Sequence, residues 1–333
     1  MIKYVNEDLK YKIALSLIPN IGDILAKRLV AYCGSAEMIF KEKKTALEKI
    51  PGIGSIQAAG IMKHDVLKRV EEEIKFIEKN NIRPLYYLDK EYPKRLTYCE
   101  DSPVMLYFKG EANLNAEKII SVVGTREATE HGRSTCEKLI ADLAIHNVLI
   151  VSGLAYGIDI CAHKAAIDNK LDTVSVLAHG LDKIYPSLHK QTANRMLESG
   201  GWLSDFMSGT KPDRENFPRR NRIVAGIADA TIVIESKVKG GSLITAEIAN
   251  SYNRDVFAFP GRVDDVCSVG CNNLIKQNKA ALIQSSADIV YIMGWQQTSA
   301  KAPIQKQLFI DLQPDEETVV TILKEKEELT IDE

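Results

Sequence analysis

The chain has 333 residues and a net charge of -2, with 45% hydrophobic and 26% charged residues. These values are ordinary for a globular protein and exclude a wholly disordered chain, a collagen-like fibre and a small disulfide scaffold. No apolar run approaches the roughly 18 residues that a membrane-spanning helix needs, so we expect no membrane association. The first twenty residues mix Lys, Glu and Asp among apolar positions. We therefore expect no signal peptide and a cytoplasmic protein whose six cysteines are reduced.

Residues 1–82 are expected to form an all-helical domain. Two of its segments echo each other, IPNIG at 18–22 and IPGIG at 50–54, and each is followed by apolar residues at helical spacing. The repeat resembles the helix-hairpin-helix motif of DNA-binding proteins, in which the backbone N–H groups of a helix N-terminus can seat a phosphate. Neither helix start is rich in Lys or Arg, so hairpins that serve only for packing are the alternative. Whether they touch DNA stays open.

Residues 83–295 alternate between strand and helix signals. The expected strands are short apolar runs with β-branched residues, at 104–108, 119–123, 148–151, 173–177, 231–234 and 255–259. Helical spacing lies between them, at 134–145, 159–168, 189–198, 219–227 and 244–252. Near-continuous apolar strands separated by helices are typical of a parallel sheet covered on both faces. The pattern therefore predicts an α/β fold, whose ligands bind beyond the carboxyl ends of the strands.

The end of the chain differs in composition. Residues 296–315 are polar and aperiodic and are expected to be a linker, and a short amphipathic helix is expected at 317–325. The segment 315–333 carries a net charge of -6, which leaves +4 on residues 1–314. One helix cannot bury its own apolar face, so the segment is either a fragment of a small helical domain or a docking element.

Four loops after the expected strands contain small residues, at 124–126, 152–159, 180–186 and 235–247. Glycine turns let a ligand approach the backbone, and the helix N-termini behind them favour anions. None of the loops has the GxGxxG or GxxxxGK[ST] pattern, which counts against a dinucleotide oxidoreductase and a P-loop ATPase. Several such turns on one sheet edge indicate a phosphate-bearing ligand.

The most basic segment, 211–222, has a net charge of +3 and contains the run NFPRRNR at 216–222. Arginine offers a planar fork for phosphate oxygens, and phenylalanine offers a face on which a base can stack. An aromatic residue among arginines suits single-stranded nucleic acid better than a free nucleotide. The alternatives are a solvated loop, a core position for Phe217, and arginines paired with acids such as Asp229.

Together the motifs resemble one family, the DprA (Smf) DNA-processing proteins of bacteria. The matching segments are VVGTR (122–126), SGLA (152–155), GID (157–159), AH (162–163), GLD (180–182), YP (185–186), NFPRRNRI (216–223), GSLITA (241–246), VFA (256–258), PG (260–261) and Asn272 with LI (274–275). They occur in one order over about 170 residues. The helical N-terminal region also resembles the sterile-alpha-motif-like or hairpin domain that many members carry.

The resemblance implies an extended Rossmann-like domain at 83–295 that binds single-stranded DNA and self-associates, here expected as a homodimer formed by a helix at 272–281 and its neighbouring strand. It further implies protection of incoming DNA and loading of the RecA recombinase during natural transformation. No catalytic residue, metal or cofactor is expected. Carried over by position, the DNA-binding residues are Gly124, Thr125, Arg126, Lys183, Phe217, Arg219, Asn221, Arg222, Lys237, Lys239, Gly240, Gly241 and Ser242.

The chain departs from the family pattern at three places. It has KQNKA at 276–280 where relatives have a Gly-Ala pair, His189 where an Asn is common, and at 316–333 only what resembles the first helix of a winged helix. An alternative function is a nucleoside monophosphate phosphoribohydrolase-like enzyme, in which the turn at Gly240 and Gly241 holds the phosphate and Glu247 acts on the ribose. The pairs Cys161/His163 and Cys267/Cys271 lack further ligands at zinc-like spacing.

Overall fold

The computed structural model describes residues 7–63, 65–295, 316–317 and 320–321. Residues Met1–Met293 form one compact unit and Gly294–Glu333 form a second. The expected linker at 296–315 lies outside the described residues. Of the expected helix at 317–325, only Glu317, Val320 and Thr321 are described, and they are helical.

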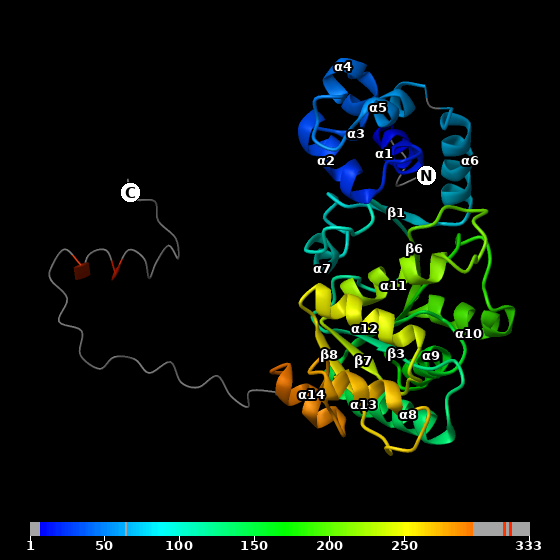
Figure 1. Ribbon diagram of the computed structural model, residues 1–333, viewed down its shortest axis with the longest axis vertical. Coiled ribbons are helices and arrows are strands. Elements are labelled where there is room, and N and C mark those ends of the chain that lie inside the picture. The colour runs from blue at the N-terminus through cyan, green and yellow to red at the C-terminus, as the bar shows by residue number, and fades with distance from the viewer. Residues whose placement is uncertain (1–6, 64, 296–315, 318–319, 322–333) are drawn as a thin grey trace. The chain divides into compact units, whose positions relative to one another are not determined.

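The N-terminal region is helical, as expected (Figure 1). Its helices are α1 (Glu7–Leu17), α2 (Asp23–Cys33), α3 (Ala36–Lys41), α4 (Lys44–Leu47), α5 (Ser55–Met62) and α6 (Leu67–Lys79). Ile13, Leu29 and Ile39 are fully buried between them. Gly22 and Gly54 are the residues immediately before α2 and α5, so each of the two repeated segments does open a helix.

A nine-stranded sheet follows in the order β1-β2-β6-β5-β4-β3-β7-β8-β9. Only β1 with β2 and β2 with β6 pair antiparallel, which confirms the mostly parallel sheet. The strands are β1 (Arg83–Tyr86), β2 (Met105–Gly110), β3 (Ile119–Val123), β4 (Leu149–Ser152), β5 (Thr173–Val176), β6 (Gly201–Ser204), β7 (Ala230–Val233), β8 (Asp255–Ala258) and β9 (Ala281–Leu282).

The connecting helices lie on both faces of this sheet. They are α7 (Lys94–Thr97), α8 (Glu130–Leu143), α9 (Ile158–Asp168), α10 (Lys190–Arg195), α11 (Asn216–Gly226), α12 (Gly241–Ser251), α13 (Val269–Lys276) and α14 (Ser286–Ile292). Short 3-10 turns are at Ala144–His146, Ser187–His189 and Met196–Glu198. Helices α11 and α12 pack side by side on one face, and α8 and α9 pack on the other (Figure 1).

Five of the six expected strands were predicted to within one residue at each end, β2 ends two residues later than expected, and three other strands were not predicted. In β3 all five residues are buried, so the sequence signal is continuous. The missed strands have weak signals: β1 contains Pro84, β6 begins with Gly201, and β9 has two exposed residues. A proline or a glycine weakens a strand signal because it removes a hydrogen-bond donor or a packing side chain.

The helix expected at 272–281 is shorter and starts earlier than predicted. Helix α13 ends at Lys276, and Asn278 has a left-handed φ of 55°. The Lys279 N–H donates to the Leu274 carbonyl oxygen at 2.8 Å, so the chain turns back and enters β9. Asparagine is among the few residues that adopt this backbone conformation readily, and the turn is therefore encoded within the KQNKA segment at 276–280.

The helical region and the sheet share one apolar core. The cluster that holds Ile13 and Leu29 continues without a break to Tyr86, Met105 and Trp202 of the sheet region. A second cluster on the sheet contains Val123, Val151 and Val233 together with Val224 of α11. The N-terminal domain is thus packed onto the β1-β2-β6 end of the sheet.

Candidate nucleic-acid interface

A pocket of about 740 Å³ opens at the carboxyl edge of the parallel strands. It lies at the point where the strand order reverses, because β3 connects onward to β4 on one side while β7 connects to β8 on the other. Such a switch point is where open α/β sheets bind ligands. The lining comes from five segments: the turns after β3, β4, β5 and β7, and α11 with the loop before it.

The turn after β3 is held in place by its neighbours. The Thr125 N–H donates to the Glu235 carbonyl oxygen at 2.8 Å, and the Thr125 carbonyl oxygen accepts from the Ile158 N–H at 3.2 Å. Gly157 has a φ of +77°, and a Cβ there would lie 2.1 Å from the Thr125 carbonyl oxygen. Only glycine permits this approach of the two turns, which fixes the backbone that carries Arg126.

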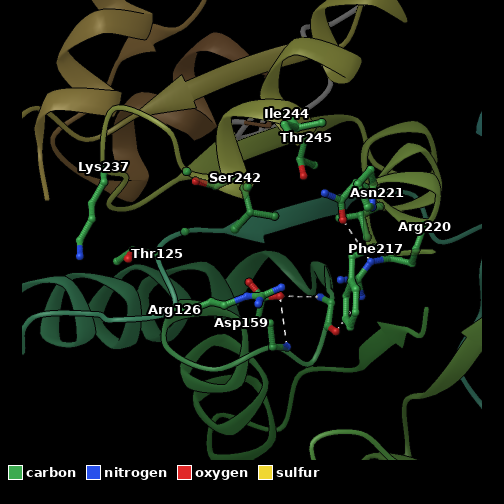
Figure 2. A pocket seen from close by; sticks show the side chains of 18 of the residues that line it. Thr125, Arg126, Asp159, Phe217, Arg220, Asn221, Lys237, Ser242, Ile244 and Thr245 are labelled. Atoms are coloured by element: carbon green, nitrogen blue, oxygen red, sulfur yellow. Dashed lines mark hydrogen bonds between the residues drawn. The ribbon is translucent and has the colours of Figure 1, made fainter. Parts of the chain in front are cut away.

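Arg126 and Phe217 meet in the pocket (Figure 2). The Arg126 guanidinium lies over the Phe217 ring, 5.4 Å from its centroid. Tyr185 also lines the pocket, and its ring centroid is 6.2 Å from that of Phe217 at an interplanar angle of 57°. Phe217 is partly exposed and is therefore not a core residue. A cation and two aromatic rings thus face the same space.

A buried arginine and a buried carboxylate form the floor of the pocket. Arg220 donates to the Gly153 carbonyl oxygen at 2.7 Å and to the Val176 carbonyl oxygen, and Asp159 accepts from the Gly153 and Ala155 N–H groups at 3.2 and 3.3 Å. Burial raises the pKa of Asp159, and the Arg220 charge and these N–H groups oppose the rise. Burial lowers the pKa of Arg220 to about 10, so Arg220 is still charged at neutral pH and places a cation beside Asp159 in the floor.

The turn before α12 supplies the opposite wall. Gly240 is the last residue before the helix, and the first turn of α12 holds no acidic side chain. Gly240, Gly241 and Ser242 line the pocket together with Lys237 and Lys239. The Ser242 hydroxyl donates to the Ser236 hydroxyl at 3.0 Å, and Lys237 forms an ion pair with the exposed Glu127. A helix N-terminus with no carboxylate of its own is a favourable place for an anion.

Ten of the thirteen carried-over residues line the pocket. They are Gly124, Thr125, Arg126, Phe217, Asn221, Lys237, Lys239, Gly240, Gly241 and Ser242. Among the pocket residues that the sequence did not single out, Arg220 and Asp159 lie inside motifs that were quoted, and Tyr185 follows the turn at Gly180. A signal for Arg220 existed, because it lies one helical turn from Phe217.

Lys183, Arg219 and Arg222 do not line the pocket. Lys183 lies 3.4 Å from the Asp182 carboxylate, and the Arg219 guanidinium lies over Phe206, 5.3 Å from the ring centroid. Arg222 is partly buried and forms ion pairs with Asp205 at 2.8 Å and Asp23 at 3.0 Å. For the two arginines the reason is that α11 begins at Asn216 and not at 219. Positions 217, 221 and 224 therefore share the pocket face of the helix, and 219 and 222 fall outside it.

Other candidate groups have structural roles. His163 is fully buried, its Nδ1 lies 2.7 Å from the Thr173 hydroxyl oxygen, and burial lowers its pKa to about 3. Within the described residues there is no group of three or more His, Cys, Asp or Glu side chains that could hold a metal. Among the same residues no helix is long and apolar enough to span a bilayer.

A mostly parallel sheet with arginine and aromatic side chains in a pocket at its switch point is typical of α/β proteins that bind nucleotides or nucleic acids. Comparison with known proteins narrows this class, since residues 83–294 match the family model described as DNA recombination-mediator protein A. The chain belongs to this family of DNA-processing proteins.

Individual relatives agree with this assignment. Over 203 residues the chain is 41% identical to DNA processing protein DprA of Streptococcus pneumoniae, covering 61% of this chain and 71% of that protein. Over 307 residues it is 33% identical to Protein Smf of a Synechocystis species, covering 87% and 73% of the two chains. The name of the Streptococcus pneumoniae relative describes DNA processing.

Two solved structures share the fold. The X-ray structure of DNA processing protein A from Streptococcus pneumoniae matches with a TM-score of 0.74 at 31% identity, over 87% of this chain and 98% of that one. DNA processing protein A from Helicobacter pylori, studied for its single-stranded DNA binding mode, matches with a TM-score of 0.59 at 27% identity, over 64% and 96%. The extended Rossmann-like fold is thereby confirmed.

Proposed function

We propose that the pocket at the sheet's switch point binds single-stranded DNA, with Arg126 and the N-terminus of α12 on backbone phosphates and Phe217 against a base. One observation carries the proposal: a guanidinium lies over a partly exposed phenylalanine ring in a pocket walled by a helix N-terminus. Arginine, aromatic faces and backbone N–H groups are the features that hold unpaired strands without reading their sequence. The single-stranded DNA binding of the Helicobacter pylori relative supports it.

The geometry couples the two contacts. In the unbound protein the Arg126 guanidinium covers one face of the Phe217 ring. A phosphate that draws Arg126 toward α12 uncovers that face for a base. Gly124, Thr125, Asn221, Lys237, Lys239, Gly240, Gly241 and Ser242 complete the proposed site.

Replacement of Arg126 by Ala tests the site. We expect the affinity for an oligo-dT strand to fall about tenfold, since a hydrogen bond to a charged group contributes about 1.5–3 kcal/mol. The slope of log K against log salt should become shallower by about 0.7, which corresponds to one phosphate. Lys183→Ala, outside the pocket, is the matched control and should change neither quantity. Unchanged binding by Arg126→Ala, measured by fluorescence anisotropy, would reject the site.

We further propose that the chain loads a RecA-type recombinase onto the bound strand and protects that strand during natural transformation. The support is the family's description as a recombination mediator. The test is filament formation by RecA on oligo-dT covered with a single-strand-binding protein, which this chain should accelerate and the Arg126→Ala variant should not. Equal acceleration by both proteins would show that recombinase loading does not depend on the pocket.

A homodimer through the β9 end of the sheet is the remaining proposal. Strand β9 is an edge strand and its Leu282 is exposed, and α14, which follows β9 in the chain, exposes Tyr291 and Ile292. Two linked grooves on one strand give avidity. Light scattering should show a dimer at micromolar concentration, which Leu282→Lys should shift toward monomer. A monomer in both samples would count against the dimer.

The phosphoribohydrolase-like alternative has less support. Its candidate acid, Glu247, lies 3.2 Å from Lys279 and does not line the pocket. The buried pocket carboxylate, Asp159, is engaged by backbone N–H groups of its own loop. Incubation with nucleoside monophosphates should therefore release no free base.

A further inference from the structure

The loop at 205–215 connects β6 to α11 and forms part of the pocket. It contributes Pro212 and Arg214 to the lining and leads directly into Phe217. Its position therefore affects every contact that α11 makes in the pocket. The loop does not stand alone, because Ser208 near its start is bonded to the N-terminal helical domain.

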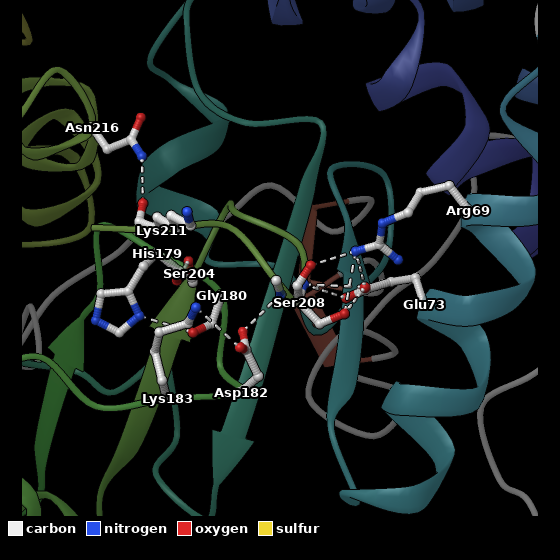
Figure 3. A network of polar contacts seen from close by, with 11 residues as sticks. Arg69, Glu73, His179, Gly180, Asp182, Lys183, Ser204, Ser208, Lys211 and Asn216 are labelled. Atoms are coloured by element: carbon white, nitrogen blue, oxygen red, sulfur yellow. Dashed lines mark hydrogen bonds and ion pairs between the residues drawn. The ribbon is translucent and has the colours of Figure 1, made fainter. Parts of the chain in front are cut away.

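Helix α6 holds the start of this loop (Figure 3). The Glu73 carboxylate is 2% exposed and accepts the Ser208 N–H at 3.1 Å and the Ser208 hydroxyl at 2.5 Å. Arg69 donates to the same carboxylate at 2.7 Å and to the Ser208 carbonyl oxygen at 2.5 Å. A buried carboxylate needs such partners, and here Arg69 and the loop supply them.

From Ser208 the restraint passes along the loop toward the pocket (Figure 3). The Gly209 N–H donates to Asp182 at 2.9 Å, and the Thr210 carbonyl oxygen accepts from the Gly180 N–H at 3.3 Å. The Lys211 carbonyl oxygen then accepts from the Asn216 side chain at 3.0 Å, at the first residue of α11. Each residue from 208 to 211 is thus held by a hydrogen bond, and together these bonds link Glu73 to the helix that carries Phe217.

A second group of polar contacts, made by Arg222, joins the N-terminal domain to α11. Arg222 donates to Asp205, the first residue of the loop, and to Asp23 at the start of α2, and it also donates to the Asp101 carbonyl oxygen. Burial by itself lowers the pKa of Arg222, but Asp205 and Asp23 outweigh burial and raise it. Arg222 therefore stays charged, and the helix face opposite to the pocket is tied to the N-terminal domain.

We propose that Glu73 is a positioning residue for DNA binding: through Ser208 the N-terminal domain holds the 205–215 loop and α11 in the geometry that forms the pocket. The inference rests on the proposed binding of single-stranded DNA at that pocket. It gives the helical domain a role in affinity without any contact between this domain and the strand.

The test uses three variants of the full chain and an oligo-dT strand. Glu73→Ala removes the acceptor for Ser208 and should weaken binding about tenfold, the range in which coupling through packed networks acts. Glu73→Gln keeps an acceptor oxygen and should recover affinity to within about threefold of the unsubstituted chain. Lys27→Met is the matched control: Lys27 donates to Ser102 at 2.7 Å and to the Glu100 carbonyl oxygen at 2.9 Å, so it joins the same two regions away from the loop. It should bind like the unsubstituted chain.

Hydrogen exchange adds a readout that does not depend on binding. In Glu73→Ala, peptides that cover 206–215 should exchange faster than in Lys27→Met, because the loop loses its anchor. Normal affinity of Glu73→Ala, or an equal loss in Lys27→Met, would overturn the inference. If the unsubstituted chain binds oligo-dT and Arg126→Ala weakens it, the proposed function stands whatever Glu73→Ala does. If the unsubstituted chain does not bind, the proposed function itself fails.

Discussion

Helices α2 and α12 begin in the same way and face different chemistry. Each follows a glycine with an extended backbone, Gly22 in one case and Gly240 in the other. In α2 the next residue is Asp23, whose carboxylate accepts the Val104 N–H at 2.9 Å and Arg222 at 3.0 Å. In α12 the next residue is Gly241, and the wall it forms opens into the pocket.

The difference shows what decides the use of a helix N-terminus. The partial positive charge there attracts an anion, and in α2 the protein's own carboxylate meets it. In the second hairpin the Gln57 side chain accepts the Gly54 N–H at 3.1 Å. Both hairpin turns are thus engaged within the protein, which favours packing over phosphate binding for the N-terminal domain, whereas the first turn of α12 has no acidic side chain.

Conversion of the α12 turn into the α2 turn should have the largest effect on binding. Gly241→Asp places a carboxylate where Asp23 stands in α2, and nothing lies within 4 Å of the new Cβ. A carboxylate about 8 Å from a phosphate costs about 2 kcal/mol at an effective dielectric near 20, or about 30-fold in affinity for oligo-dT. Gly241→Asn is the neutral control and should lose about threefold or less. Full affinity in Gly241→Asp, measured by anisotropy, would show that the two turns are not distinguished by charge.

Removal of the α2 carboxylate should act on stability. Asp23→Ala leaves the Val104 N–H and one side of the partly buried Arg222 without their acceptor, and should lower the free energy of unfolding by about 1–2 kcal/mol. Glu37→Ala, which breaks the exposed pair with Lys41, should lower it by about 0.5 kcal/mol or less. Urea titration compares the two, and equal midpoints for all three proteins would mean that Asp23 has no structural role.

Sequence patterns predicted the pocket residues better than the contacts of Glu73 and Arg222 that join the N-terminal domain to the sheet region, and the reason is physical. Turns after parallel strands meet at one sheet edge, so Gly124, Arg126 and Gly241 could be grouped without coordinates. To predict which residues of α11 face the pocket, one must know where the helix begins. Pro218 concealed the start at Asn216, because proline usually interrupts a helix and yet is tolerated in its first turn. Arg222 was therefore assigned to the pocket. Its partner Asp23 lies 199 positions away, and no local pattern indicates such a pair.

The aromatic contact should contribute less than the charge at the α12 turn. Phe217→Leu keeps an apolar side chain and removes the ring face, so affinity for oligo-dT should fall about fivefold, toward the lower end of the 1–3 kcal/mol that stacking on one base contributes. Phe217→Tyr retains the ring and should bind within about twofold. The salt slope should not change in either variant, because neither loses a phosphate contact. A loss of affinity in Phe217→Tyr as large as in Phe217→Leu would argue against stacking.

The smallest effect on binding is expected from a substitution at the second hairpin, 50–54. This substitution tests whether a helix N-terminus of the N-terminal domain binds a phosphate, as the N-terminus of α12 is proposed to do. Arg28 is the cation nearest to that turn: it donates to the Pro51 carbonyl oxygen at 2.8 Å and covers Gly52. If the hairpin seated a phosphate, Arg28→Ala would weaken binding and reduce the salt slope by about 0.7, as Arg126→Ala should. Because Arg28 is bonded within its own domain and the hairpin N–H at Gly54 is capped, we expect an affinity within about twofold and an unchanged slope. A reduced slope would mean that both regions hold the strand.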